Sequence, residues 1–319
     1  MAEGVASDVP PARGGAALKA NMLRYLKQAR SALSMLNPDE VRERAERRLA
    51  VGLVSSTSAA YADMEDFLAP AAVSHDKRME VMRLVYRAGD PDIPARFDLV
   101  LYEQGLPCPA DAFTFFRDDP DRTVEDVLNE REHLGLALAR NFHPFRKPVV
   151  DRVIASVARE NGIFAIASAL PNVLPSLLEL PWSIGEFASD TAFITMNQVR
   201  MAFLVAAASD KKVGYAEQKA ELLSILGGAF GWRALARELV SFIPLGGGLL
   251  PKGAIAYAAT YVLGKGLEHF HGVGYGYTRA QRRDAYQIAY ERGKEVVSSA
   301  LGRHAAAKNA TQERGKRAR

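Results

Sequence analysis

The first stretch that could do chemistry is "VGLVSSTSAAYADM", residues 51–64, an apolar run followed by a turn-like and then a helix-like segment. A phosphate-binding loop has this context and needs two glycines, a lysine and a hydroxyl in the order G-x-x-x-x-G-K-[ST]. On that frame Ser55 and Ala60 occupy the glycine positions, Tyr61 the lysine position and Ala62 the hydroxyl position. No N-K-x-D guanine-reading motif follows. The pattern therefore predicts neither nucleotide binding nor nucleotide hydrolysis.

A second glycine-rich stretch, "PLGGGLLPKG" at residues 244–253, also fails as a phosphate cradle. Lys252 precedes Gly253 instead of following it, and a proline before the lysine removes a backbone N–H. We expect a bend between two apolar helices here. The residues that would form this bend are Pro244, Gly246, Gly247, Gly248 and Pro251.

Four polar residues recur at helical spacing within an apolar segment: Glu186, Asp190, Asn197 and Arg200. At about 100° per residue they lie within about 40° of one line along a helix. They form either a solvated face or structural network, or a buried polar network that lines a partner or ligand site, because buried charge is unfavourable unless paired.

The sequence shows no cluster of residues typical of a metal site or a catalytic site. Glu268, His269 and His271 are close in sequence, but residues two apart point to opposite sides of a helix and cannot share one ion there. His143 and His75 are isolated. We therefore predict no catalytic residues, no metal and no cofactor.

The elements that would position these residues are mostly helices. A helix is expected over residues 16–36, and "NPDEVRERAERRL" begins another, with Asn37 as its cap and Pro38 in its first position. Residues 48–56 and 96–105 read as strands, and residues 78–89 between them read as a third strand or a helix.

Further along the chain, a capped helix is expected to begin near Thr123, and from Pro148 to about Leu301 the pattern is helical with Pro and Gly breaks. The fold class expected is α+β, mainly α, with a small α/β segment in the N-terminal half. The expected divisions are a disordered segment 1–15, an N-terminal region 16–147, a helical domain 148–302 and a disordered basic tail 303–319.

Charge is concentrated at the C-terminus. Residues 303–319 hold six Lys or Arg against one Glu, a net charge of +5, so the other residues carry −1 of the total of +4. Without aromatic side chains this tail cannot read bases by stacking, which argues against sequence-specific nucleic-acid binding. It could contact anionic lipid.

Three long apolar runs bear on membrane association: residues 162–178, 191–209 and 239–263. Prolines, glycines, Arg200 or Lys252 interrupt them, so none is a plain span of about 20 apolar residues. The N-terminus has no apolar segment typical of a signal peptide, and the single cysteine, Cys108, fits a reducing compartment.

The C-terminal half resembles a known family through four ordered segments: "NQVRM", "VGYAEQKAELLSIL", "GWRALARELVSFIP" and "AIAYAATYVLGKGLEHF" after a glycine-rich bend. Together they resemble the bacterial family called domain of unknown function 697, over about residues 160–271. The resemblance implies a companion Era-like GTPase domain and a membrane location, and it carries over no catalytic residue. The N-terminal region would then be either a degenerate G-like domain or an unrelated α/β segment.

The function expected is that of a non-enzymatic, membrane-associated helical protein on the cytoplasmic side, which binds a protein partner such as a GTPase. The basic tail would favour the anionic cytoplasmic leaflet. The alternative is a soluble cytoplasmic helical scaffold whose apolar runs form its core. A nucleotide-binding enzyme is the third hypothesis. The sequence does not predict an oligomeric state.

Overall fold

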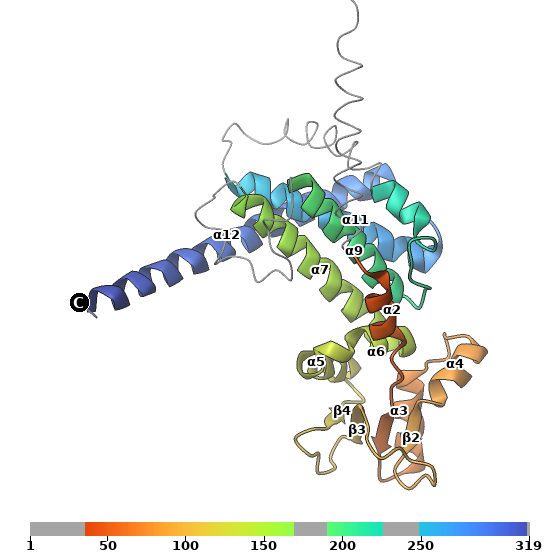
Figure 1. Ribbon diagram of the computed structural model, residues 1–319. Helices are drawn as coiled ribbons and strands as arrows, with labels where there is room; N and C mark the ends of the chain where they lie inside the picture. Colours follow the sequence, from red (N-terminus) through yellow and green to blue (C-terminus); the bar gives the residue numbers. More distant parts are fainter. Residues whose placement is uncertain (1–35, 169–189, 226–248, 318–319) are drawn as a thin grey trace, which may run out of the picture.

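A computed structural model describes residues 36–168, 190–225 and 249–317. The chain forms a small α/β layer and a larger helical bundle, joined by α6 and α7 (Figure 1). The fold is therefore α+β and mainly α, as the sequence predicts. The elements up to the junction are α2 (Pro38–Glu46), β1 (Val51–Val54), α3 (Ser58–Leu68), α4 (His75–Met82), β2 (Val85–Arg87), β3 (Leu99–Glu103), β4 (Phe113–Phe115), α5 (Pro120–Glu130), a 3₁₀ turn (Glu132–Leu134) and α6 (Gly135–Asn141).

The sheet is four-stranded and parallel, in the order β2-β1-β3-β4. Its two central strands are apolar because helices cover them, as parallel strands require. Val51 and Leu53 of β1 are fully buried, and Leu101 of β3 pairs with Leu53. Residues 78–89, expected to be a strand or a helix, contain both: α4 ends at Met82 and β2 follows after two residues.

Side-chain caps define where the short helices start. Asn37 accepts a hydrogen bond from Asp39 N, and Pro38 occupies the first helical position, as predicted. The helix expected to begin near Thr123 begins three residues earlier, because Asp119 caps it and Pro120 takes the first position. Thr123 is buried inside the helix, where its hydroxyl accepts a hydrogen bond from Phe116 N at 2.9 Å.

Within the described ranges, the bundle contains four long helices. They are α7 (His143–Ala167), α9 (Asp190–Ala208), α11 (Leu249–Val273) and α12 (Arg279–Arg317). Helix α7 packs against α9 and α11, and α12 packs along α11 before it projects away from the body (Figure 1).

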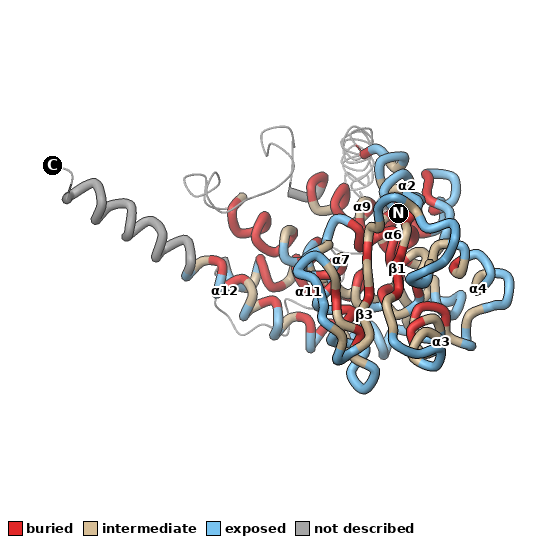
Figure 2. Tube along the Cα trace, turned by 90° about the horizontal axis from the view of Figure 1, so that it is seen from below, coloured by how far each residue is buried: buried red, intermediate tan, exposed pale blue. Residues whose placement is uncertain are grey.

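One hydrophobic core runs through both parts of the molecule, from the strands through α6 and α7 into the bundle (Figure 2). The expected division between residues 147 and 148 accordingly falls inside α7. Pro148 does not end this helix. As its sixth residue it removes only one helical hydrogen bond, and the neighbouring helices hold the rest in place.

Three expected segments differ from the structure or lie outside it. Helix α12 continues to Arg317 through residues expected to be disordered, because the stretch is rich in Ala, Lys, Gln and Arg, which favour helix. The expected disordered segment 1–15, and the expected helix over residues 16–36 apart from Leu36, lie outside the described residues.

Candidate functional site

The turn between β1 and α3 is where the sequence frame for a phosphate loop falls. β1 ends at Val54 and α3 begins at Ser58, so only three residues connect them. In the strand order β2-β1-β3-β4, the next two strands along the chain, β2 and β3, pair with opposite sides of β1. Open parallel sheets bind ligands beyond the carboxyl ends of such neighbouring strands, which makes this edge the first place to test for a ligand site.

A carboxylate of the protein itself occupies this position. Glu103 is the last residue of β3, and its Oε2 accepts hydrogen bonds from Ser55 Oγ at 2.9 Å, Ser56 N at 2.8 Å and Ser56 Oγ at 2.7 Å. The backbone N–H of Ser56, followed by the two hydroxyls, lowers the pKa of Glu103, so the group is anionic at neutral pH. A phosphate at this turn would have to displace that carboxylate or lie beside a like charge.

The lysine position of the frame is also committed to internal contacts. Tyr61 lies in α3 with the guanidinium of Arg87 5.3 Å from its ring centre. Arg87, at the end of β2, donates to Glu65 of α3 through Nε at 2.6 Å and Nη2 at 2.8 Å. This hydrogen-bonded pairing, together with the charge of Glu65, raises the pKa of Arg87 despite some burial. The cation beside the lysine position of the frame therefore pairs with a carboxylate of α3.

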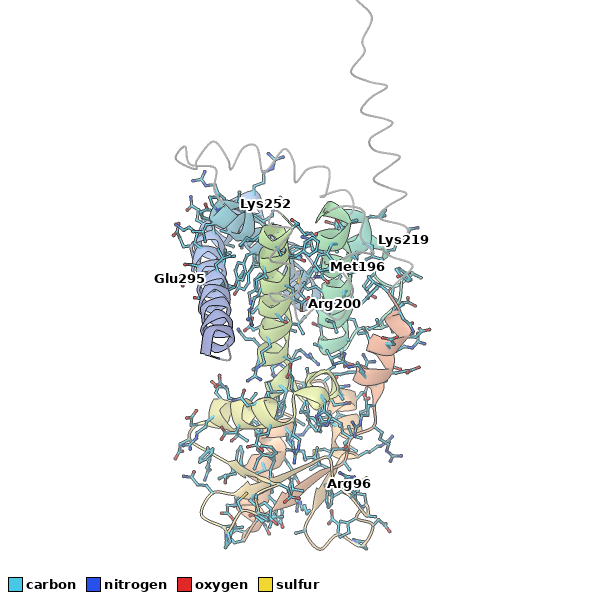
Figure 3. The ribbon with its side chains drawn as sticks, turned by 60° about the vertical axis from the view of Figure 1, so that its left-hand side comes forward. Arg96, Met196, Arg200, Lys219, Lys252 and Glu295 are labelled. Carbon is cyan, nitrogen blue, oxygen red and sulfur yellow. The ribbon has the colours of Figure 1, made fainter. Side chains whose placement is uncertain are left out.

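The predicted polar stripe is found in part, at the interface of α9 with α7 (Figure 3). Arg200 forms an ion pair with Glu160 of α7. Asn197 is fully buried and donates through Nδ2 to Glu160 Oε2 at 3.3 Å and to Asn161 Oδ1 at 3.0 Å. Glu186 lies outside the described residues, and Asp190 is the first residue of α9, with its side chain outside the description.

The network extends to a third helix. Asn161 donates through Nδ2 to Thr260 Oγ1 of α11 at 2.9 Å, and Gln198 of α9 donates to the same hydroxyl at 3.4 Å. Asn161 and Thr260 are both fully buried. Polar groups at the centre of an apolar bundle fix the register of its helices, because a shifted register leaves them unsatisfied.

Sequence reasoning missed the α7 and α11 members of this network. Glu160 and Asn161 directly precede the apolar end of α7, residues 162–167, and polar residues at the border of such a run are the signal that could have identified them. The predicted stripe is thus a network between helices, in which Asn197 and Arg200 lie beside residues that its spacing did not include.

The glycine-rich bend can be assessed only at its end. Pro244, Gly246, Gly247 and Gly248 lie outside the described residues. Pro251 is the third residue of α11, where a missing N–H removes no helical hydrogen bond. Its neighbour Lys252 reaches the hydroxyl of Ser168 at the end of α7, at 3.2 Å.

The histidines of α11 separate, as their spacing predicts. His269 packs against the rings of Tyr275 and Tyr277, whereas His271 is buried, with its Nε2 3.9 Å from Glu221 Oε1. Burial lowers the pKa of His271; Glu221 opposes this effect and Lys211 adds to it. Within the described residues, no group of three or more His, Cys, Asp or Glu side chains is placed to hold a metal ion.

None of the helices in the described ranges has an apolar stretch long enough to cross a bilayer. No protein-family model matches the chain, and no curated protein and no solved structure matches it either. The likeness of residues 160–271 to domain of unknown function 697 therefore stays a prediction.

Proposed function

We propose that this protein is a non-enzymatic helical protein that binds a partner protein, such as a GTPase, and associates with the cytoplasmic face of a membrane. The observation that carries the non-enzymatic part is the contact of Glu103 with Ser55 and Ser56. The edge of the sheet where a nucleotide phosphate would bind already holds a hydrogen-bonded anion. The α/β layer then serves as a structural base for the bundle.

Membrane association rests on the bundle and on α12. Helix α12 projects from the body (Figure 1), and residues 303–319, all but two of which lie in its last part, carry the net charge of +5. Each Lys or Arg near an anionic leaflet contributes about 1 kcal/mol of attraction. In this proposal α12 attaches the protein to the membrane through electrostatics. The apolar runs of residues 162–178 and 239–263 strengthen the attachment.

A second candidate, a soluble helical scaffold, is favoured by how the described parts of the apolar runs pack. Residues 162–167 end α7 and are all buried, and in α11 Ala254, Tyr257 and Ala258 are buried. The two helices approach closely, since a Cβ at Gly162 would lie 3.1 Å from Gly253 O. These portions contribute to the core of the protein.

Fractionation of the full chain distinguishes the two candidates. Membranes containing the expressed protein would be washed in low salt, then high salt, then alkaline carbonate. Retention through carbonate supports embedded apolar segments, and release by high salt supports attachment by α12 alone, because salt screens surface charge. A protein that is soluble before any wash contradicts membrane association and supports the scaffold. A variant with all six basic residues of 303–319 changed to Gln should lose only the salt-sensitive attachment.

Nucleotide binding is tested separately, by thermal shift with GTP and Mg²⁺. Wild-type protein should show no shift, because Glu103 occupies the anion position. Glu103→Ala frees the Ser55 and Ser56 donors at the start of α3 and should gain a stabilising response to inorganic phosphate, by mass action. Glu125→Ala, an exposed carboxylate on α5, is the control and should behave like wild type. A Mg²⁺-dependent GTP shift in the wild type would overturn the non-enzymatic proposal.

A further inference from the structure

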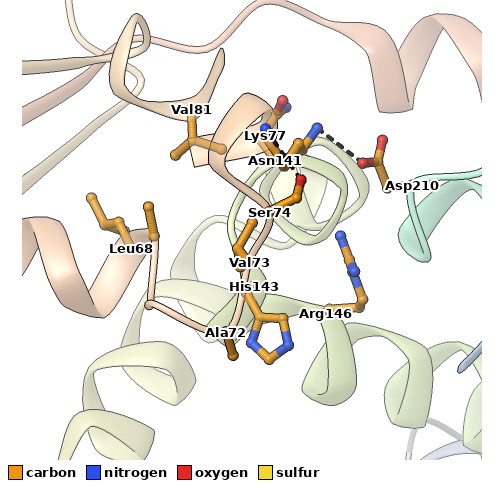
Figure 4. A pocket seen from close by; sticks show the side chains of 11 residues that line it. Leu68, Ala72, Val73, Ser74, Lys77, Val81, Asn141, His143, Arg146 and Asp210 are labelled. Atoms are coloured by element: carbon orange, nitrogen blue, oxygen red, sulfur yellow. Dashed lines mark hydrogen bonds and ion pairs between the residues drawn. The ribbon is translucent and has the colours of Figure 1, made fainter. Parts of the chain in front are cut away.

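A cavity of about 340 Å³ lies where the α/β layer meets the bundle (Figure 4). It is lined by the end of α3, the loop that follows, α4, the α6–α7 corner and Asp210, two residues after the end of α9. Part of its wall is apolar and part is charged. The apolar part is formed by Leu68, Ala72, Val73 and Val81. Most of the exposed lining is polar, and several polar and charged groups converge on the cavity, which suits a ligand with a charged group.

The charged wall places three cations around one carboxylate. Asp210 Oδ2 is 3.0 Å from Lys77 Nζ, and Asp210 Oδ1 is 3.7 Å from Arg140 Nε (Figure 4 shows the contact with Lys77). Arg146 extends from α7 toward the same carboxylate (Figure 4). The other carboxylates near Lys77 and Arg140 belong to the outer surface, where the side chains of Glu80 and Glu46 are 63% and 46% exposed.

Arg146 is the least neutralised of the three. Its guanidinium donates only to the carbonyls of Ala139 and Arg140, both at the limiting distance of 3.5 Å. Among the described residues, no carboxylate oxygen lies within 4.0 Å of it. Burial lowers the pKa of Arg146; Asp210 opposes this effect, and the charge of Arg140 adds to it. A half-buried guanidinium with such weak partners is in an unfavourable environment unless an anion joins it.

Asp210 lies at a left-handed backbone position where α9 ends. Asp210 has a φ of 59° and ends α9 in a Schellman arrangement, in which Lys211 N donates to Ala206 O at 2.9 Å and Asp210 N donates to Ala207 O at 3.2 Å. Glycine usually occupies this left-handed position. An aspartate there accepts some backbone strain and places a single negative charge at the rim of a cationic cavity.

Two helices also begin at this cavity. Ser74 caps α4 and lines the cavity. His143, the first residue of the 25-residue α7, also lines it. No side chain caps α7, unlike α2, α3, α4 and α5. The positive ends of helices favour anions, so the first turn of α7 is an unfavourable place for the cation Arg146 unless an anion binds beside it.

We propose that this cavity binds a small organic anion. Its phosphate or carboxylate head lies between Lys77 and Arg146, and its apolar part packs against Val73 and Val81. When the site is empty, Asp210 pairs with these cations and offsets their mutual repulsion. A bound head group competes with Asp210 for the same cations. This proposal is independent of the function proposed above, because Glu103 and the β1–α3 turn take no part in it.

Binding would be measured on the full chain by thermal shift and calorimetry at constant ionic strength, with phenyl phosphate and benzoate as probes and phenol as the uncharged match. Wild-type protein should be stabilised in proportion to the logarithm of probe concentration by at least one of the two anions, and the stronger response identifies the head group. Arg146→Gln should weaken that binding at least tenfold. Lys219→Gln, which removes an exposed lysine near the far end of the bundle, should leave it unchanged (Figure 3).

Asp210→Asn keeps a residue that tolerates the left-handed conformation and removes the competing carboxylate, so it should bind the anion more tightly than wild type. If Arg146→Gln fails to fold, Lys77→Gln takes its place with the same expectation. An equal response to phenol, no response to either anion, or weaker binding by Asp210→Asn would each overturn the proposal. Those results would make the cluster a structural contact between α4 and α7.

Discussion

Two glycines of α11 offer a matched test of how closely the bundle helices pack. Gly264 and Gly266 are two residues apart in the middle of the same helix. A Cβ at Gly264 would lie 2.8 Å from both Ile154 Cγ1 and Ile154 Cγ2 of α7 and 3.0 Å from the sulfur of Met201 of α9. A Cβ at Gly266 would have no atom outside its own helix within 4 Å.

The magnitudes follow from two opposing effects. Replacing glycine with alanine within a helix is favourable by about 0.8–1 kcal/mol, and this gain is common to both positions. Only Gly264→Ala must also push apart a buried, β-branched Ile154 and a neighbouring helix, which is unfavourable by about 1–3 kcal/mol. Gly266→Ala should therefore stabilise the protein, and the two variants should differ by about 1–3 kcal/mol.

Urea unfolding of both variants, with the same slope against denaturant, gives the two free energies directly. A double variant, Gly264→Ala with Ile154→Ala, checks the cause. Because Ile154→Ala removes both of the clashing γ carbons, Gly264→Ala should be less destabilising in that background than in the wild type. Equal stability of Gly264→Ala and Gly266→Ala would refute the close approach of α7, α9 and α11 at this level, and with it the argument that their register is fixed.

Two other predictions concern partly buried polar groups of the bundle. Glu160→Gln and Arg200→Met should each destabilise the protein by about 1.5–3 kcal/mol, and a double-mutant cycle should show coupling of at least about 0.5 kcal/mol, whereas additive effects would contradict a direct pair. Burial lowers the pKa of His271 in the folded protein. As pH decreases, this histidine therefore gains a proton in the unfolded chain before it does in the folded protein, and wild-type stability should fall below about pH 6.5. The free energy of unfolding, measured by urea titration between pH 5 and 8, should depend less steeply on pH for His271→Gln than for the wild type. The two pH slopes should differ by at most about 1.4 kcal/mol per pH unit, and identical slopes would exclude the burial argument.

Local signals predict much of the α/β layer. The cap and proline at residues 37 and 38 place the start of α2, and the apolar runs place β1 and β3 within a few residues. The start of α5 is missed by three residues, because Asp119 is one of several adjacent acidic residues that could cap a helix. Such signals work because caps and strand patterns depend on neighbours in sequence.

Contacts between distant elements were not predictable in the same way. Spacing places Asn197 and Arg200 on one face of a helix, but it does not say that Glu160 of α7 faces them, since that depends on how two helices cross. The sequence frame shows that the glycines, lysine and hydroxyl of a phosphate loop are missing at the β1–α3 turn, but the carboxylate that occupies this turn comes from a strand 48 residues away. The junction cavity likewise combines residues from α4, α7 and the end of α9.

Pro148 makes one point in α7 easier to bend than the rest of the helix. The proline leaves the carbonyl of Pro144 without its usual helical donor, one turn beyond the cationic cavity. From Pro148 to Ala167 the helix is a rod of about 30 Å, so a tilt of about 5° at the proline moves its far end by about 3 Å. The far end is where Ser168 meets Lys252 at the start of α11. A change of direction at the proline would therefore reach α11 as a displacement at this contact, and α9 and α11, which pack along α7, would resist it.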